Sequence, residues 1–274
     1  MIAFAYYGAK NGLLKDLLPL LPECSHYCEP FSGSATVLLN RKPSPIETLN
    51  DLNGEIVNFF EVLRDNAGNL VDKLLLTPYS RKEFESAWEI HPDIVERARR
   101  FFIRTQMDIS KGGIKYNKSW SSAATASHSN PAKRFFNKLP GLLEVAERLR
   151  LVQVENKPAI DVIMKYDKYD TLFYLDPPYL KQTRNAKNEY AFEMSMVEHV
   201  QLAKALNAAR GMVALSGYDS PEMGILYNGW NKILFKPKIV PMSRGNGLVR
   251  QECLWLNYDP QVKADLYKKQ YRIL

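Results

Sequence analysis

The sequence predicts a doubly wound α/β sheet that is interrupted by a mainly helical insertion. Short apolar runs with strand character alternate with amphipathic helical runs near both ends of the chain, and this alternation stops over residues 66–149. Such alternation is typical of a parallel sheet with helices on both faces. The chain has 274 residues, 46% of them hydrophobic and 24% charged, which is enough for one large globular domain with an insertion.

The first part of the chain has the order of an opening strand–helix–strand unit. An apolar helical run ends at Pro22, because proline does not continue a helix. Small residues follow the first expected strand, and an acidic residue follows the second. The expected strands lie over 26–29 and 46–50, and the expected helices over 13–21, 36–40 and 55–63.

Residues 66–149 break this order, and we expect them to form a smaller inserted domain. They have helical patterns to about residue 107 and again over 140–149. A loop rich in Gly, Ser and Asn lies between, over 110–131, and loops of that length are usually functional or disordered.

From residue 150 the alternation resumes, so we expect residues 1–65 and 150–274 to share one sheet. The expected strands are 151–155, 171–175 and 212–216, the expected helices are 159–165 and 196–209, and 232–240 and 249–257 form a closing pair of strands.

The basic charge of the chain is concentrated in one segment. The whole chain carries +7, whereas ten Lys or Arg and one acid between Arg97 and Lys138 give that segment +9, so the rest sums to −2. A local excess of this kind can follow a phosphate backbone, which favours contact with nucleic acid. A solvated helix face with a loop is the plainer interpretation.

Cysteine usage and hydropathy exclude several classes of protein. Cys24, Cys28 and Cys253 are too few and too scattered for a disulfide framework. The cluster around His26 has no second ligand pair at a zinc-like spacing, so no metal site is expected. No apolar run approaches the ~20 residues that span a bilayer, and the N-terminus lacks a signal-peptide pattern. We therefore expect a cytoplasmic protein with no membrane contact and no obligate protein partner.

The tetrapeptide Asp176-Pro177-Pro178-Tyr179 directly follows an apolar strand, where ligands bind in open α/β sheets. Two prolines remove two N–H donors and leave carbonyl oxygens free in a rigid turn. A planar amine has two hydrogens to donate, and the Asp176 carboxylate with the Pro177 carbonyl supplies two acceptors. Tyr179 offers a flat ring for stacking a base. A stiff turn with a helix-capping aspartate is the plainer alternative.

A loop of small residues follows the first expected strand, in the order Glu29-Pro30-Phe31-Ser32-Gly33-Ser34-Ala35. Such a loop allows a cofactor to approach the backbone at a helix N-terminus. Asp51 ends the second strand, where acids commonly bind ribose hydroxyls. The alternative for Asp51 is a helix N-cap, since Asn53 and Glu55 follow.

Together these motifs resemble the D12 class, or Dam-type, N6-adenine DNA methyltransferases. That family has a D-P-P-Y motif after the fourth strand, an F-x-G-x-G-like loop after the first, and a target-recognition domain between them. The resemblance implies a Rossmann-like class I sheet, the cofactor S-adenosyl-L-methionine and double-stranded DNA as substrate. The loop departs from the family pattern at Ala35, which replaces the second glycine, and Pro158 stands near a position where relatives often have an acid.

The resemblance also implies roles for individual residues. Tyr6-Tyr7-Gly8-Ala9-Lys10 is similar to the family's W-x-G-G-K-like segment, whose aromatic and lysine contact the cofactor, the lysine at its carboxylate. The expected cofactor-binding residues are Tyr6, Tyr7, Gly8, Lys10, Glu29, Pro30, Phe31, Ser32, Gly33, Ser34, Asp51 and Asp176. The expected catalytic residues are Asp176, Pro177, Pro178 and Tyr179.

The expected DNA contacts lie in the basic insertion and in two polar loops. They are Lys111, Lys115, Asn117, Trp120, Arg134, Arg184, Lys187 and Arg244. Two alternatives stay open at this point: methylation of another planar amine, in RNA or in a protein, and a non-catalytic DNA-binding homologue.

Overall fold

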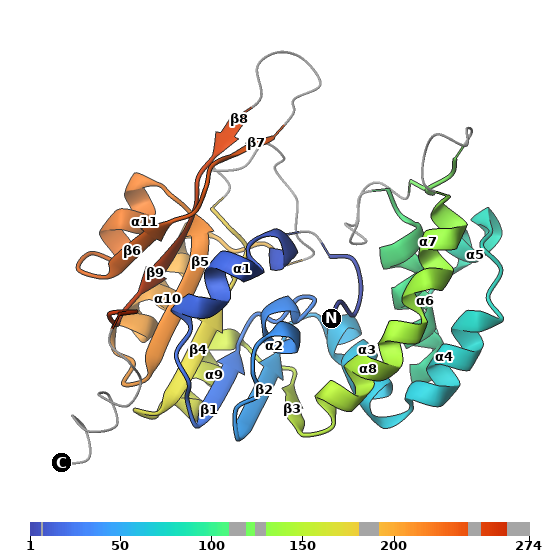
Figure 1. Ribbon diagram of the computed structural model, residues 1–274, viewed down its shortest axis with the longest axis horizontal. Coiled ribbons are helices and arrows are strands. Elements are labelled where there is room, and N and C mark those ends of the chain that lie inside the picture. The colour runs from blue at the N-terminus through green and yellow to red at the C-terminus, as the bar shows by residue number, and fades with distance from the viewer. Residues whose placement is uncertain (7, 110–118, 124–129, 181–191, 241–247, 262–274) are drawn as a thin grey trace.

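The computed structural model describes residues 1–6, 8–109, 119–123, 130–180, 192–240 and 248–261 (Figure 1). The expected residues Tyr7, Lys111, Lys115, Asn117, Arg184, Lys187 and Arg244 lie outside these ranges.

A seven-stranded sheet has the order β3-β2-β1-β4-β5-β9-β6. Strands β1 to β5 are parallel, whereas β9 is antiparallel to both β5 and β6. This arrangement confirms the expected doubly wound α/β class. The strands are β1 (His26–Glu29), β2 (Ile46–Asn50), β3 (Val152–Glu155), β4 (Thr171–Leu175), β5 (Met212–Tyr218), β6 (Asn231–Leu234) and β9 (Glu252–Leu256).

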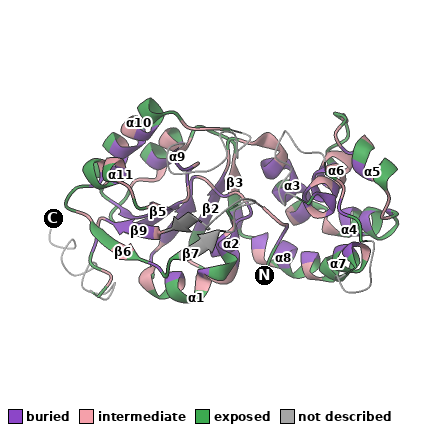
Figure 2. Ribbon diagram, turned by 90° about the horizontal axis from the view of Figure 1, so that it is seen from above, coloured by how far each residue is buried: buried purple, intermediate pink, exposed green. Residues whose placement is uncertain are grey.

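The two faces of the sheet pack against different helices. Successive strand residues point to opposite faces, so Leu172 and Tyr174 join one apolar cluster while Phe173 and Leu175 join the other. The first cluster includes α1 (Leu14–Leu17), α2 (Thr36–Asn40) and α3 (Gly54–Asp65). The second includes α9 (Ala159–Tyr166), α10 (Met196–Asn207) and α11 (Pro221–Leu226). Figure 2 shows the buried strands in the middle and the exposed surface on the outer sides of the helices.

Helices fill the stretch between α3 and β3, to the right of the sheet in Figure 1. Their buried side chains, among them Phe102 and Leu142, belong to the first apolar cluster together with Phe59 of α3. The division of the chain at 65/66 and 149/150 stays a prediction. These helices are α4 (Ala67–Leu75), α5 (Arg81–Ser86), α6 (Ile94–Met107), α7 (Pro131–Lys138) and α8 (Pro140–Leu149).

The structure changes two expected elements. The run 13–21 is a short α1 followed by a 3-10 turn, η2 (Leu18–Leu20), with Pro19 in its first turn. Each closing strand is split, because residues 235–237 and Gln251 separate a small ribbon from the main sheet. That ribbon consists of β7 (Lys238–Val240) and β8 (Leu248–Arg250), which pair antiparallel with each other.

Candidate active site

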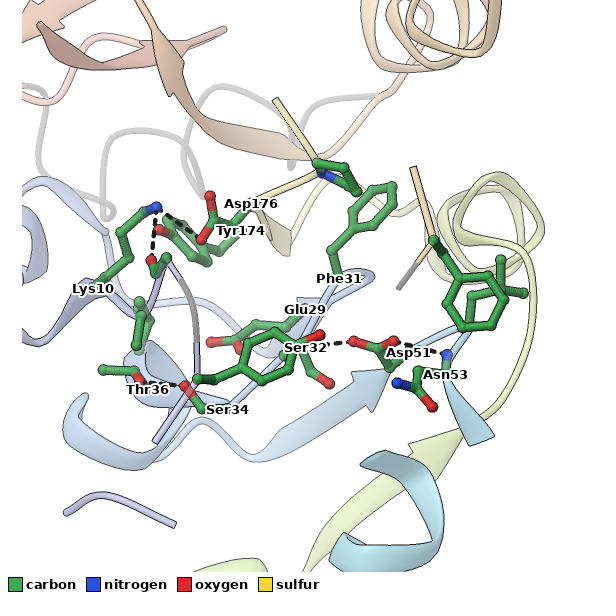
Figure 3. A pocket seen from close by; sticks show the side chains of 18 of the residues that line it. Lys10, Glu29, Phe31, Ser32, Ser34, Thr36, Asp51, Asn53, Tyr174 and Asp176 are labelled. Carbon is green, nitrogen blue, oxygen red and sulfur yellow. Dashed lines mark hydrogen bonds and ion pairs between the residues drawn. The ribbon is translucent and has the colours of Figure 1, made fainter. Parts of the chain in front are cut away.

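A cavity opens at the carboxyl ends of β1, β2 and β4, where the expected motifs meet (Figure 3). Figure 3 shows Lys10 and Asp176 at one end of it and Asp51 with Asn53 at the other. The expected residues that line it are Tyr6, Gly8, Lys10, Glu29, Phe31, Ser32, Gly33, Ser34, Asp51, Asp176 and Pro178.

The loop after β1 has a backbone that small residues fit. Gly33 has φ +47, and a Cβ added there would lie 3.2 Å from the ring of Tyr6. Ala35 also adopts a left-handed conformation, with φ 52 and ψ 30, just before α2. Glycine is the residue that adopts this conformation without strain, which gives a physical reason for the family's second glycine.

Asp51 follows β2 and is held by backbone groups. Its Oδ2 accepts a hydrogen bond from Gly33 N at 2.9 Å, and its Oδ1 accepts one from Asn53 N at 2.8 Å. Burial raises the pKa of Asp51 to about 6, although both hydrogen bonds oppose that shift. Asn53, rather than Asp51, is the N-cap of α3, because its side chain accepts from Glu55 N. Asp51 is therefore a carboxylate fixed at the cavity wall by two local loops.

Glu29 ends β1 at the floor of the cavity and is 2% exposed. Its Oε1 accepts from the Tyr27 hydroxyl at 2.8 Å and from Leu38 N at 2.7 Å. Burial raises the pKa of Glu29 to about 8, because two hydrogen-bond donors compensate the lost hydration only in part. Its neighbour Pro30 contributes a carbonyl oxygen that accepts from Asn50 Nδ2 at 2.9 Å, which ties the loop to β2.

At the end of the cavity opposite Asp51, side chains from distant segments of the chain surround Asp176. Lys10 Nζ lies 2.8 Å from Asp176 Oδ2 and 3.2 Å from Glu252 Oε1. Burial raises the pKa of Asp176, while the Lys10 ammonium opposes the rise. The two carboxylates hold the pKa of Lys10 above its usual value despite burial, so this lysine is a fixed cation. Lys10 thus contacts the reaction-motif carboxylate, and its contact with the cofactor's carboxylate stays a prediction.

Tyr179 is 6% exposed and is fixed through its hydroxyl group. It donates to Glu252 Oε1 at 2.5 Å and accepts from Lys10 Nζ at 2.7 Å. Its ring meets that of Tyr218 edge to face, with centroids 4.7 Å apart. Stacking a base on this ring requires neighbouring residues to move away. Tyr179 and Pro177 line a smaller hollow beside the main cavity.

Several residues at this site are not among those predicted from the sequence. Glu252 begins the apolar strand β9, and a lone acid there was a signal that we did not use. Tyr174 lies two residues before Asp176 on the same strand, and its hydroxyl is 2.9 Å from Ser216 Oγ. Phe192, Glu193 and Met194 precede α10 and line the cavity, but no motif pointed to them.

The two predicted DNA-contacting residues that the structure describes lie in different surroundings. Trp120 is half-buried, with its ring near Tyr79 and the Arg81 guanidinium 4.7 Å from its centroid. Arg134 is exposed on α7, next to the exposed Lys133. The helix therefore presents two adjacent cations to solvent, while Trp120 packs against the helical core.

Four arginines of α6 account for much of the basic segment and form ion pairs within the protein. Arg97 and Arg104 pair with Glu55, and Arg99 and Arg100 pair with Glu96. The +9 segment begins just after Glu96, so counting from Arg97 left out one of these partners. The charge argument for nucleic acid therefore depends on fewer cations than the sequence indicated, with Lys133 and Arg134 among those described.

Within the described ranges, no group of three or more His, Cys, Asp or Glu side chains is placed to hold a metal ion. The helices described are also too short or too polar for any of them to cross a membrane.

Comparison with known proteins gives a consistent result. The family model for D12 class N6 adenine-specific DNA methyltransferases matches residues 6–236. The type II methyltransferase M1.LlaDCHI of Lactococcus lactis subsp. cremoris is 25% identical over 247 residues, which are 82% of this chain and 83% of that protein. A DNA N-6-adenine-methyltransferase of Escherichia phage P1 is 34% identical over 68 residues, 25% of this chain and 9% of that protein.

One solved structure, a conserved hypothetical protein of Streptococcus pyogenes, aligns over 93% of this chain and 98% of its own with a TM-score of 0.37 and 11% identity.

Proposed function

The chain belongs to the D12 class of N6 adenine-specific DNA methyltransferases, and on that premise we propose how its cavity serves methyl transfer from S-adenosyl-L-methionine to adenine N6 in double-stranded DNA. The observation that carries the proposal is that Asp51 and Asp176 face one cavity from opposite ends. One carboxylate suits the cofactor's ribose, and the other suits the amine of the target base.

The residues present fit the cofactor. Gly33 leaves room at the loop, and Asp51 offers carboxylate oxygens to ribose hydroxyls. Phe31 and Leu52 add apolar surface for a flat ring. When bound, S-adenosyl-L-methionine supplies a methyl group on a positively charged sulfur, which suits a cavity with acidic walls.

Asp176 and the Pro177 carbonyl receive the target amine. Each accepts one of its two N–H hydrogens, which orients the nitrogen lone pair along the direction of attack. Asp176 also stabilises the positive charge that develops on the nitrogen, and the methylated amine becomes neutral again by losing one of its two protons to solvent. The base reaches this position by leaving the duplex, at a cost of a few kcal/mol. The chain's contribution is therefore positioning and electrostatics.

Lys133 and Arg134 on α7 are proposed as phosphate contacts. They are adjacent and exposed, and neither forms an ion pair with another residue that the structure describes, so each can exchange its hydration for a phosphate. Because the substrate is DNA, the proposal places the protein in the cytoplasm of a bacterial or phage-infected cell.

The test is transfer of labelled methyl from S-adenosyl-L-methionine to duplex DNA, with digestion of the product and mass spectrometry of the nucleosides. We expect N6-methyladenine with the native chain. If the labelled methyl group appeared in RNA or protein instead of DNA, the assignment of DNA as the substrate would be wrong. DNA binding without transfer would indicate a non-catalytic homologue.

The phosphate contacts have their own test. The paired change Lys133→Ala and Arg134→Ala should weaken DNA binding and make the slope of log affinity against log salt shallower by about 2. The matched control is Lys204→Ala with Arg210→Ala, two exposed cations at the other end of the molecule. Equal losses from both pairs would contradict the assignment of α7.

A further inference from the structure

We propose that Glu252 is a positioning residue for methyl transfer, which shares the charge of Lys10 with Asp176 and fixes the ring of Tyr179. This inference rests on the proposed function, because it assigns part of the machinery for that reaction. Glu252 has no place in the tetrapeptide motif and lies on a strand near the other end of the chain.

The position of Glu252 follows from the sheet. Strand β9 pairs antiparallel with β5, and the register places Glu252 opposite Tyr218. Tyr218 packs edge to face on Tyr179, so the same register brings the Glu252 carboxylate to the Tyr179 hydroxyl. The Glu252 side chain is 12% exposed, which leaves little room for alternative orientations.

The charges around Lys10 explain why a second carboxylate matters. Lys10, with its side chain 7% exposed, contacts both Asp176 and Glu252, so the three groups together carry a net charge of −1. Without Glu252 the ammonium would pair with Asp176 alone, and the net charge would be zero. Asp176 would then be a weaker acceptor for an amine that gains positive charge during transfer. Glu252 therefore preserves the negative character of Asp176.

The Tyr179 hydroxyl is held between the same two groups. It accepts from Lys10 and donates to Glu252, so its ring direction is fixed at two hydrogen bonds. Once its neighbours have moved to admit a base, a tyrosine held this way needs no reorientation of its own ring, which reduces the entropy lost on binding.

A second cluster in the chain provides a matched control. Glu155 also accepts from a tyrosine hydroxyl, that of Tyr166 at 2.6 Å, and pairs with Lys165 at 2.5 Å. Its side chain is 15% exposed, close to the value for Glu252, but it is not among the residues that line the cavity. Glu155→Gln therefore removes a carboxylate of similar exposure from a lysine and a tyrosine outside the site, where the lysine side chain is 48% exposed and that of Lys10 is 7% exposed.

The experiment compares Glu252→Gln with Glu155→Gln in the full chain. The amide keeps the size and an acceptor oxygen but removes the charge. For Glu252→Gln we expect the single-turnover methylation rate to fall about 10-fold or more. Affinity for S-adenosyl-L-methionine by calorimetry, KM for DNA and thermal unfolding should stay near the native values, and Glu155→Gln should methylate at the native rate. Equal rates for the two variants, or a loss of cofactor affinity that accounts for the slower rate, would overturn the proposal.

A double variant tests the charge argument itself. The double variant Lys10→Met with Glu252→Gln restores a net charge of −1 at Asp176. It should therefore methylate DNA faster than Glu252→Gln alone, so the rate losses caused by the two single substitutions should not multiply. Independent, multiplying losses would overturn the charge-sharing role. A native chain that methylates no DNA at all would instead contradict the proposed function, and with it this inference. Native activity with an unaffected Glu252→Gln variant contradicts the inference alone.

Discussion

Two carboxylates at opposite ends of one cavity are held in different ways. Asp51 accepts hydrogen bonds from the backbone N–H groups of Gly33 and Asn53. Asp176 is held by a side chain, that of Lys10, which in turn contacts Glu252. The Asp51 end is built from neighbouring loops, whereas the Asp176 end joins residues from the beginning, middle and end of the chain.

The different partners of Asp51 and Asp176 suit the two carboxylates to different tasks. Backbone donors fix the direction of the Asp51 oxygens without adding a formal charge, which suits a group that binds hydroxyls. Side-chain charges set how strongly Asp176 accepts a hydrogen bond, which suits a group that stabilises charge in a reaction. Substitutions at the two ends should therefore affect different kinetic constants.

The largest effect is expected at the Asp176 end. Asp176→Asn keeps the shape but removes the negative charge that stabilises the developing cation. The methylation rate should fall by about 1,000-fold or more, with cofactor affinity changed only a few-fold. Single-turnover assays and calorimetry measure the two quantities. A variant with more than a tenth of the native rate would remove Asp176 from its assigned role.

At the Asp51 end, Asp51→Asn should weaken binding of S-adenosyl-L-methionine and leave the rate at saturation nearly unchanged. A hydrogen bond to a charged group contributes about 1.5–3 kcal/mol, so affinity should fall about 10- to 100-fold. Calorimetry gives the affinity, and kcat with KM for the cofactor gives the kinetic comparison. A loss in kcat with native affinity would reverse the roles assigned to the two ends.

The pH dependence of cofactor affinity should also distinguish the Asp51 end of the cavity from the Asp176 end. The pKa of Asp51 is about 6, and its ionised form is the acceptor for ribose hydroxyls. Cofactor affinity should therefore be constant at high pH and fall as the pH drops through about 6, by up to about tenfold per pH unit. Affinities measured from pH 5 to 8 test this. The same pH dependence in Asp51→Asn would assign the titration to another group.

The smallest effect concerns the backbone that supports Asp51. Gly33→Ala places a Cβ at φ +47 and 3.2 Å from the Tyr6 ring, so it should lower the free energy of unfolding by about 1–2 kcal/mol. Gly68→Ala in α4 is the control, because its Cβ meets nothing within 4 Å, and it should be neutral or slightly stabilising. Urea unfolding measures both, and equal changes would contradict the strain at Gly33.

Local pattern determined much of the fold. The strands at 26–29, 46–50 and 171–175 and the helices at 36–40 and 140–149 have the expected limits. These elements depend on apolar periodicity and on Pro at helix starts, which act between near neighbours. The predicted limits of the closing strands were less accurate. The interruption at residues 235–237 depends on how the ribbon of β7 and β8 leaves the main sheet.

The sequence by itself determined the order of the elements, and with it the placement of Asp51 and Asp176 at the ends of parallel strands. Only the tertiary structure decided which charges meet between distant segments: Lys10 with Asp176 and Glu252, and Arg97 and Arg104 of α6 with Glu55 of α3. The physical reason is range. Periodicity and turn chemistry act over a few residues, whereas an ion pair between distant segments depends on the register of β9 against β5 and on the packing of α3 against α6.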